Sequence, residues 1–85
     1  MRKSLSATEA VKLRAWLASG RAAQLRLDAG LSKAALARDA GVAESAILRW
    51  ESGERRPTGL YAAAYYRTLA RLARSAEDCG GSDAA

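Results

Sequence analysis

Near the middle of the chain, polar residues are spaced so that they share one side of a short predicted helix. Glu44, Ser45 and Arg49 fall on this side and offer a carboxylate, a hydroxyl and a guanidinium. Ile47 and Trp50, three residues apart, face another side and predict a buried stripe. A helix with one buried face and one polar, partly charged face is suited to lying in the major groove of DNA. The segment therefore predicts binding chemistry rather than bond breaking.

Catalytic chemistry has few candidate residues in this sequence. There is no His, no nucleophile stands beside a base, and the one cysteine, Cys79, lies in a small polar tail. One cysteine cannot form an internal disulfide, and without His or a second Cys it cannot complete a metal site. We therefore expect a protein that is not an enzyme, with no cofactor, no metal and no evident small-molecule ligand.

The polar face needs two short helices to position it, predicted at residues 33–40 and 43–52. Gly41 stands between them and supplies the left-handed backbone that a sharp turn between helices requires. Ser32 precedes the first of the two as a capping residue. This arrangement predicts a helix-turn-helix unit.

The composition predicts an all-α protein of about five short helices. Ala, Leu, Arg and Glu are abundant, whereas β-branched residues are scarce and Phe is absent. Ser6 and Thr8 are the two candidate caps of a first helix, and Gly30 is expected to end the second. The expected organisation is a flexible N-terminus at residues 1–5, a single helix-turn-helix DNA-binding domain at residues 6–74 and a disordered acidic tail at residues 75–85.

The charge of the chain is basic and unevenly distributed. The 85 residues carry a formal net charge of +5. The tail holds three acidic residues and no basic one, so residues 1–74 carry all 14 Lys and Arg against six acids, or +8. A basic body suits a polyanionic partner. No apolar segment is long enough for a membrane span or typical of a signal peptide, so we expect a cytoplasmic protein.

One basic residue of the second predicted helix requires a partner. Arg26 shares an otherwise apolar face with Ala22 and Leu25. Because burying an unpaired charge is costly, an anionic partner is expected, and Glu51 is the candidate.

The segment from about residue 20 to residue 73 contains a long pattern with fixed spacing. The pattern is GLS-x-x-x-LA-x-x-x-GV-x-x-x-x-I-x-x-W-E-x-G, and ERRP follows it. In this pattern the chain resembles the lambda-type Cro and repressor helix-turn-helix family, also called the XRE type. The resemblance implies a lambda-repressor-like domain with an extra N-terminal helix. That extra helix, in SATEAVKLRAWLASG, looks like those of small regulators from actinobacterial phages or their hosts.

The resemblance also implies roles for individual residues. The positions that face DNA bases in the family are Ala43, Glu44, Ser45 and Arg49. The positions that fit contacts to the DNA backbone are Lys33, Arg55 and Arg56. Arg26 and Glu51 match a structural ion pair of the family. Arg49 is suited to a bidentate contact with guanine, and Glu44 to accepting from cytosine N4.

Three positions depart from the family pattern. Lys33 stands where Gln is usual and cannot accept a hydrogen bond. Ala43 replaces the favoured Ser or Thr cap, and Ala46 replaces a Ser or Thr that can contact phosphate. The pattern therefore identifies helix 43–52 as the DNA-reading helix, but it does not predict which bases that helix prefers.

The function that these residues predict is a sequence-specific regulator of transcription that binds double-stranded DNA. A Cro-like repressor that inserts helix 43–52 into the major groove is the leading interpretation. Two alternatives use the same fold: an antitoxin-like or other protein-interaction module, and a DNA-architectural or recombination directionality factor.

The last predicted helix carries more apolar surface than one small core requires. We expect it to contribute to a homodimer through Tyr61, Tyr65, Tyr66, Leu69 and Leu72. The alternative is that the first helix covers this surface, which allows a monomer.

Overall fold

Five helices make up the part of the chain that the structure describes, and no strand occurs in it. The computed structural model describes the backbone of residues 4–84 and the side chains of residues 4–76. The helices are α1 (Ala7–Ser19), α2 (Arg21–Asp28), α3 (Lys33–Ala40), α4 (Glu44–Ser52) and α5 (Gly59–Ala84). The all-α prediction is confirmed, and the two central helices lie within one residue of their predicted bounds.

Capping residues determine where α1 and α3 begin. Ser6 forms a capping box with Glu9, because Ser6 Oγ accepts from the Glu9 amide at 3.2 Å and Glu9 Oε1 accepts from the Ser6 amide at 3.0 Å. Of the two candidate caps, Ser6 rather than Thr8 therefore serves α1. Ser32 caps α3 by accepting from the Ala35 amide at 3.0 Å. Caps of this kind typically contribute about 1 kcal/mol each.

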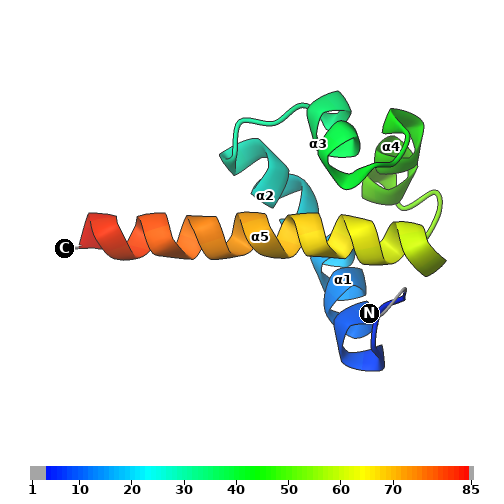
Figure 1. The fold of residues 1–85 in the computed structure, drawn as a ribbon, viewed down its shortest axis with the longest axis horizontal. Coiled ribbons are helices and arrows are strands. Elements are labelled where there is room, and N and C mark those ends of the chain that lie inside the picture. The colour runs from blue at the N-terminus through cyan, green and yellow to red at the C-terminus, as the bar shows by residue number, and fades with distance from the viewer. Residues whose placement is uncertain (1–3, 85) are drawn as a thin grey trace.

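The longest helix, α5, runs across the molecule, and the four shorter helices gather along its N-terminal part (Figure 1). α2 and α3 pack against α5, α1 packs against α2, and α4 packs against α3. The last turns of α5 extend beyond the other helices (Figure 1). None of the helices in the described part of the chain is long and apolar enough to cross a membrane.

The two ends of the chain differ from the expectation drawn from the sequence. A disordered tail was expected from residue 75, whereas α5 continues to Ala84. The packed part of α5 holds the preceding turns in place, and each further residue extends an existing helix without a new nucleation cost. Of the expected flexible N-terminus, residues 1–3 lie outside the described residues, and Leu5 packs against the core.

Every helix contributes to one hydrophobic core. Its buried residues are Leu13, Ala22, Leu25, Leu36, Ala37, Ile47, Trp50, Ala62, Tyr65 and Leu69. The alanines allow close approach of neighbouring helices, and the few large side chains fill the space between them. The rings of Trp50 and Tyr65 lie with centroids 4.8 Å apart and planes tilted by 40°, which joins α4 to α5 at the centre of the core.

α1 contacts part of the α5 surface that was expected to pair two chains. The Trp16 ring stacks on Tyr66 with centroids 5.4 Å apart and planes 20° from parallel. Tyr65 and Leu69 are fully buried within the single chain, so a second copy cannot contact them. Tyr61 stays 62% exposed. The expected homodimer surface is therefore wrong for Tyr65 and Leu69, because both side chains belong to the core of the single chain.

The core contains a hydroxyl without a hydrogen-bond partner. Among the described residues, none forms a hydrogen bond with Tyr65 Oη, and this atom is buried. Burial raises the pKa of the Tyr65 hydroxyl, and the nearby charge of Glu51 raises it further. The hydroxyl therefore stays neutral, and it is a source of instability in an otherwise apolar site.

We predict that Tyr65→Phe raises the free energy of unfolding by about 1 kcal/mol, because a buried hydroxyl without a partner costs on the order of 1–3 kcal/mol. Urea denaturation followed by circular dichroism measures this change. Tyr66→Phe, on the half-buried ring beside it, is the control and should change stability by less than about 0.5 kcal/mol. A clear loss of stability in Tyr65→Phe would show that the hydroxyl is satisfied in the folded protein.

Candidate nucleic-acid interface

The corner between α3 and α4 is built from backbone hydrogen bonds around a glycine. Gly41 follows α3 directly with φ of 75°, in the left-handed region that favours glycine. The Gly41 amide donates to the Arg38 carbonyl at 3.3 Å, and the Val42 amide donates to the Ala37 carbonyl at 2.9 Å. This is the pattern of a Schellman motif. Because Val42 packs against the core, the corner also sets the direction in which α4 leaves α3.

α4 has a buried face and an exposed polar face, as its spacing predicts. Ile47 is 0% and Trp50 is 7% exposed, and both belong to the core. Glu44, Ser45 and Arg49 are all exposed. The structure therefore brings the three predicted polar base-contacting residues together on one accessible side of a fixed helix.

Two apolar residues accompany these polar side chains, and Leu48 lies between Glu44 and Ser45 around the helix. Leu48 is 52% exposed, so its apolar side chain could contact the methyl group of a thymine. Ala43, the fourth predicted base-contacting residue, is exposed immediately before α4 and provides no side-chain cap. An alanine at this position typically forfeits about 1 kcal/mol of helix stability, so tertiary packing must hold the start of α4.

A buried ion pair fixes the last turn of α4. Arg26 Nε donates to Glu51 Oε2 at 2.8 Å, and Arg26 Nη2 donates to Glu51 Oε1 at 3.0 Å. Arg26 Nη1 donates to the Leu31 carbonyl at 3.0 Å. Both charged side chains are 8% exposed. The hydrogen bonds from Arg26 to Glu51 raise the pKa of the Arg26 guanidinium, in spite of burial. The pair that the sequence predicts is thus present, with bidentate geometry.

The end of α4 brings an acidic residue back onto the polar face. The Glu54 amide donates to the Arg49 carbonyl at 2.9 Å across Gly53, whose φ is 83°. This turn places Glu54 Oε2 3.8 Å from Arg49 Nε. The two side chains are 67% and 50% exposed, so the ion pair is weak. The sequence analysis missed this neighbour of Arg49, although the WESGE segment that forms the turn was visible.

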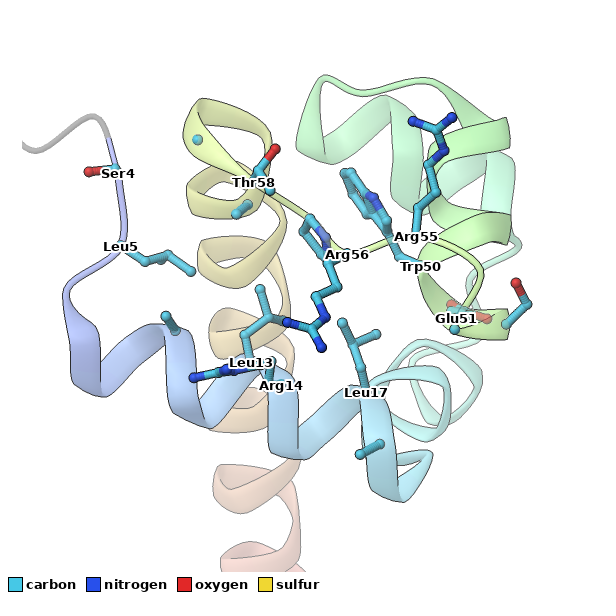
Figure 2. A pocket seen from close by; sticks show the side chains of 17 residues that line it. Ser4, Leu5, Leu13, Arg14, Leu17, Trp50, Glu51, Arg55, Arg56 and Thr58 are labelled. Atoms are coloured by element: carbon cyan, nitrogen blue, oxygen red, sulfur yellow. The ribbon is translucent and has the colours of Figure 1, made fainter.

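The predicted backbone-contacting residues occupy two places. Lys33 is the first residue of α3 and is half-buried, whereas Arg55 and Arg56 are exposed in the loop between α4 and α5. Figure 2 shows that the Arg55 side chain points away from α1, whereas Arg56 points down toward α1 and Arg14. The structure therefore separates two neighbours to which the sequence assigned one role.

The tight α3–α4 corner, the buried stripe of α4 and its exposed polar face define a helix-turn-helix protein. The chain belongs to the helix-turn-helix family of the XRE type, because the model of that family, described as Helix-turn-helix, matches residues 23–74. The family makes it a DNA-binding regulator of this type. Comparisons with curated proteins and with solved structures gave no significant match. The match includes α3, α4 and the loop after them, and it leaves α1 outside.

The ion pair generates a stability prediction. Glu51→Leu should lower the free energy of unfolding by about 3 kcal/mol, because it leaves the Arg26 guanidinium buried without its partner. The double variant Arg26→Leu, Glu51→Leu should recover most of that loss, since an apolar pair of similar size leaves no buried charge. Thermal and urea unfolding of the two variants measure the difference.

Glu54→Leu is the matched control, because it removes an exposed carboxylate from the same turn. It should change the free energy of unfolding by less than about 0.5 kcal/mol. Equal losses for Glu51→Leu and for the double variant would contradict the role given to the pair.

Proposed function

We propose that the protein binds double-stranded DNA in a sequence-specific manner and acts in the cytoplasm as a Cro-like repressor. In this proposal α4 lies in the major groove. The observation that carries it is the accessible face of Glu44, Ser45 and Arg49 on a helix whose other face is buried. A helix that is fixed on one side and polar on the other can present its side chains to base edges with little loss of entropy on binding.

Arg49 is the residue to which the proposal gives most of the sequence discrimination. Its guanidinium can donate two parallel hydrogen bonds to guanine O6 and N7. In the free protein it lies 3.8 Å from Glu54, in an exposed pair that is worth little. DNA can therefore displace Glu54 from Arg49 at small cost. Glu44 would accept from cytosine N4, and Ser45 would contact either partner of a base pair.

The loop after α4 and the start of α3 supply the proposed backbone contacts. Lys33 begins α3, and Arg55 is exposed beside the end of α4. Cations at these positions would neutralise phosphates on the two sides of the groove and fix the register of α4. Arg56 points toward α1 in the free protein, so it must change its direction to join them (Figure 2). Occupying an operator in this way would block access by competing proteins, which is the action of a simple repressor.

The proposal predicts different effects for two arginine variants. A duplex obtained by selection from random DNA serves as the operator, and binding is measured by fluorescence anisotropy at several salt concentrations. Arg49→Ala should lose about 1–3 kcal/mol on the operator and should no longer discriminate at one base position. Arg55→Ala should weaken binding to all sequences alike and should lower the salt slope by about 1.

Arg67→Ala is the matched control, because Arg67 is exposed on α5 and outside the proposed interface. It should bind the operator as the unchanged protein does, apart from a small general effect of charge. If Arg49→Ala and Arg67→Ala bind alike, Arg49 does not read a base.

A further inference from the structure

A hollow of about 800 Å³ opens between α1, the end of α4 and the loop that leads into α5. We call it the α1–loop hollow, and we define it by Leu5, Leu13, Arg14, Leu17, Trp50 and Arg56. Its volume falls in the range of roughly 300–1,000 Å³ that is usual for small-molecule sites. The hollow depends on α1, which the family match does not include.

Part of the wall of the α1–loop hollow is apolar, beside polar residues such as Ser52 and Thr58. Leu13 and Trp50 are buried members of the core that line its inner side, and Leu5 and Leu17 are half-buried at its edge. Figure 2 shows Leu5, Leu13 and Leu17 reaching from the N-terminal segment and α1 toward the loop, with Trp50 on the far side. Such walls favour an apolar ligand body by removing its surface from water.

Three arginines line the hollow, and the side chains of two of them, Arg14 and Arg56, approach it from opposite sides, whereas the Arg55 side chain points away from α1 (Figure 2). Arg14 extends from α1, and Arg56 descends from the loop toward it (Figure 2). No carboxylate of the described residues lies within ion-pair distance of either guanidinium. Glu51 also lines the hollow, but its carboxylate is held by Arg26 and its side chain is 8% exposed. An anion between Arg14 and Arg56 would form charge-assisted hydrogen bonds with two guanidiniums that have no carboxylate partner among the described residues.

We propose that the α1–loop hollow binds a small amphipathic anion. The ligand would have an apolar body and a carboxylate or phosphate head, because the planar fork of a guanidinium matches both heads. The apolar body would lie against Leu13, Leu17 and Trp50, and the head would lie between Arg14 and Arg56. The apolar part of the hollow would then be filled by the apolar body of the ligand, and the two arginines would be neutralised by its anionic head.

Binding at this place would also change DNA affinity, an inference that rests on the proposed function. Arg56 points into the hollow, whereas its neighbour Arg55 is proposed to contact a phosphate. A ligand held by Arg56 would keep that side chain and its loop from the DNA backbone. The small anion would therefore act as an effector that weakens operator binding.

Calorimetric titration of the free protein tests binding without reference to DNA. The probes are decanoate and decyl phosphate, below the concentrations at which they form micelles, and decanol as the neutral control. Decanoate, decyl phosphate or both should bind with one site per chain and at least tenfold more tightly than decanol. Tryptophan fluorescence should change on binding, because Trp50, one of the two tryptophans, lines the hollow.

Variants locate the site. Arg14→Gln and Arg56→Gln should each weaken anion binding at least fivefold, whereas Arg67→Gln, on an exposed arginine outside the hollow, should leave it within twofold. Circular dichroism confirms that each variant is folded. Equal affinity for decanol and both anions, or equal losses in all three variants, would overturn the proposal. Preference for one anion over the other identifies the head group.

A second measurement separates this inference from the proposed function. Saturating ligand should lower the affinity for the selected operator at least threefold, and Arg14→Gln should abolish that effect. Anion binding without any DNA binding would contradict the proposed function and leave the ligand site intact. DNA binding with no anion binding would overturn the ligand site alone.

Discussion

The bidentate ion pair between Arg26 and Glu51 fixes α4 relative to the rest of the domain. Its two hydrogen bonds of 2.8 and 3.0 Å cross from α2 to the last turn of α4, and a third bond from Arg26 holds the Leu31 carbonyl before α3. Both charges are almost withdrawn from water, so each depends on the other. The Trp50 ring beside this pair packs on Tyr65 and connects α4 to the core. With its last turn fixed and Ile47 and Trp50 buried, α4 leaves its polar side chains to solvent.

Local backbone signals and this one long-range pair together account for the interface. Ser32 and Gly41 determine where α3 begins and ends, but they do not determine how α4 packs against the core. The first turn of α4 lacks a side-chain cap at Ala43, so the core and the ion pair must hold the helix in place. A binding surface built on a helix fixed in this way is more rigid than one built on a loop, which favours recognition of a defined partner.

Most of the fold could be predicted from the sequence because its signals are local. Glycine, serine caps and helical spacing lie within a few residues of the features that they specify. The cost of an unpaired buried charge required an anionic partner for Arg26, and the family resemblance identified that partner as Glu51. The orientation of α1 has no such signal. The stacking of Trp16 on Tyr66 and the position of Arg14 and Arg56 around one hollow therefore appeared only in three dimensions. The burial of Tyr65 and Leu69 in the core was likewise missed, because it depends on how the other helices pack on α5.

The central claim of this account is that the exposed face of α4 reads bases in the major groove. Methylation interference tests it most directly, because dimethyl sulfate modifies guanine N7 in the major groove and adenine N3 in the minor groove, and only the first lies where Arg49 would bind. We predict that methylation of one guanine in the selected operator blocks binding by the unchanged protein, and that Arg49→Ala no longer responds to methylation of that guanine. Interference confined to adenine N3, or the same guanine pattern for both proteins, would contradict the account.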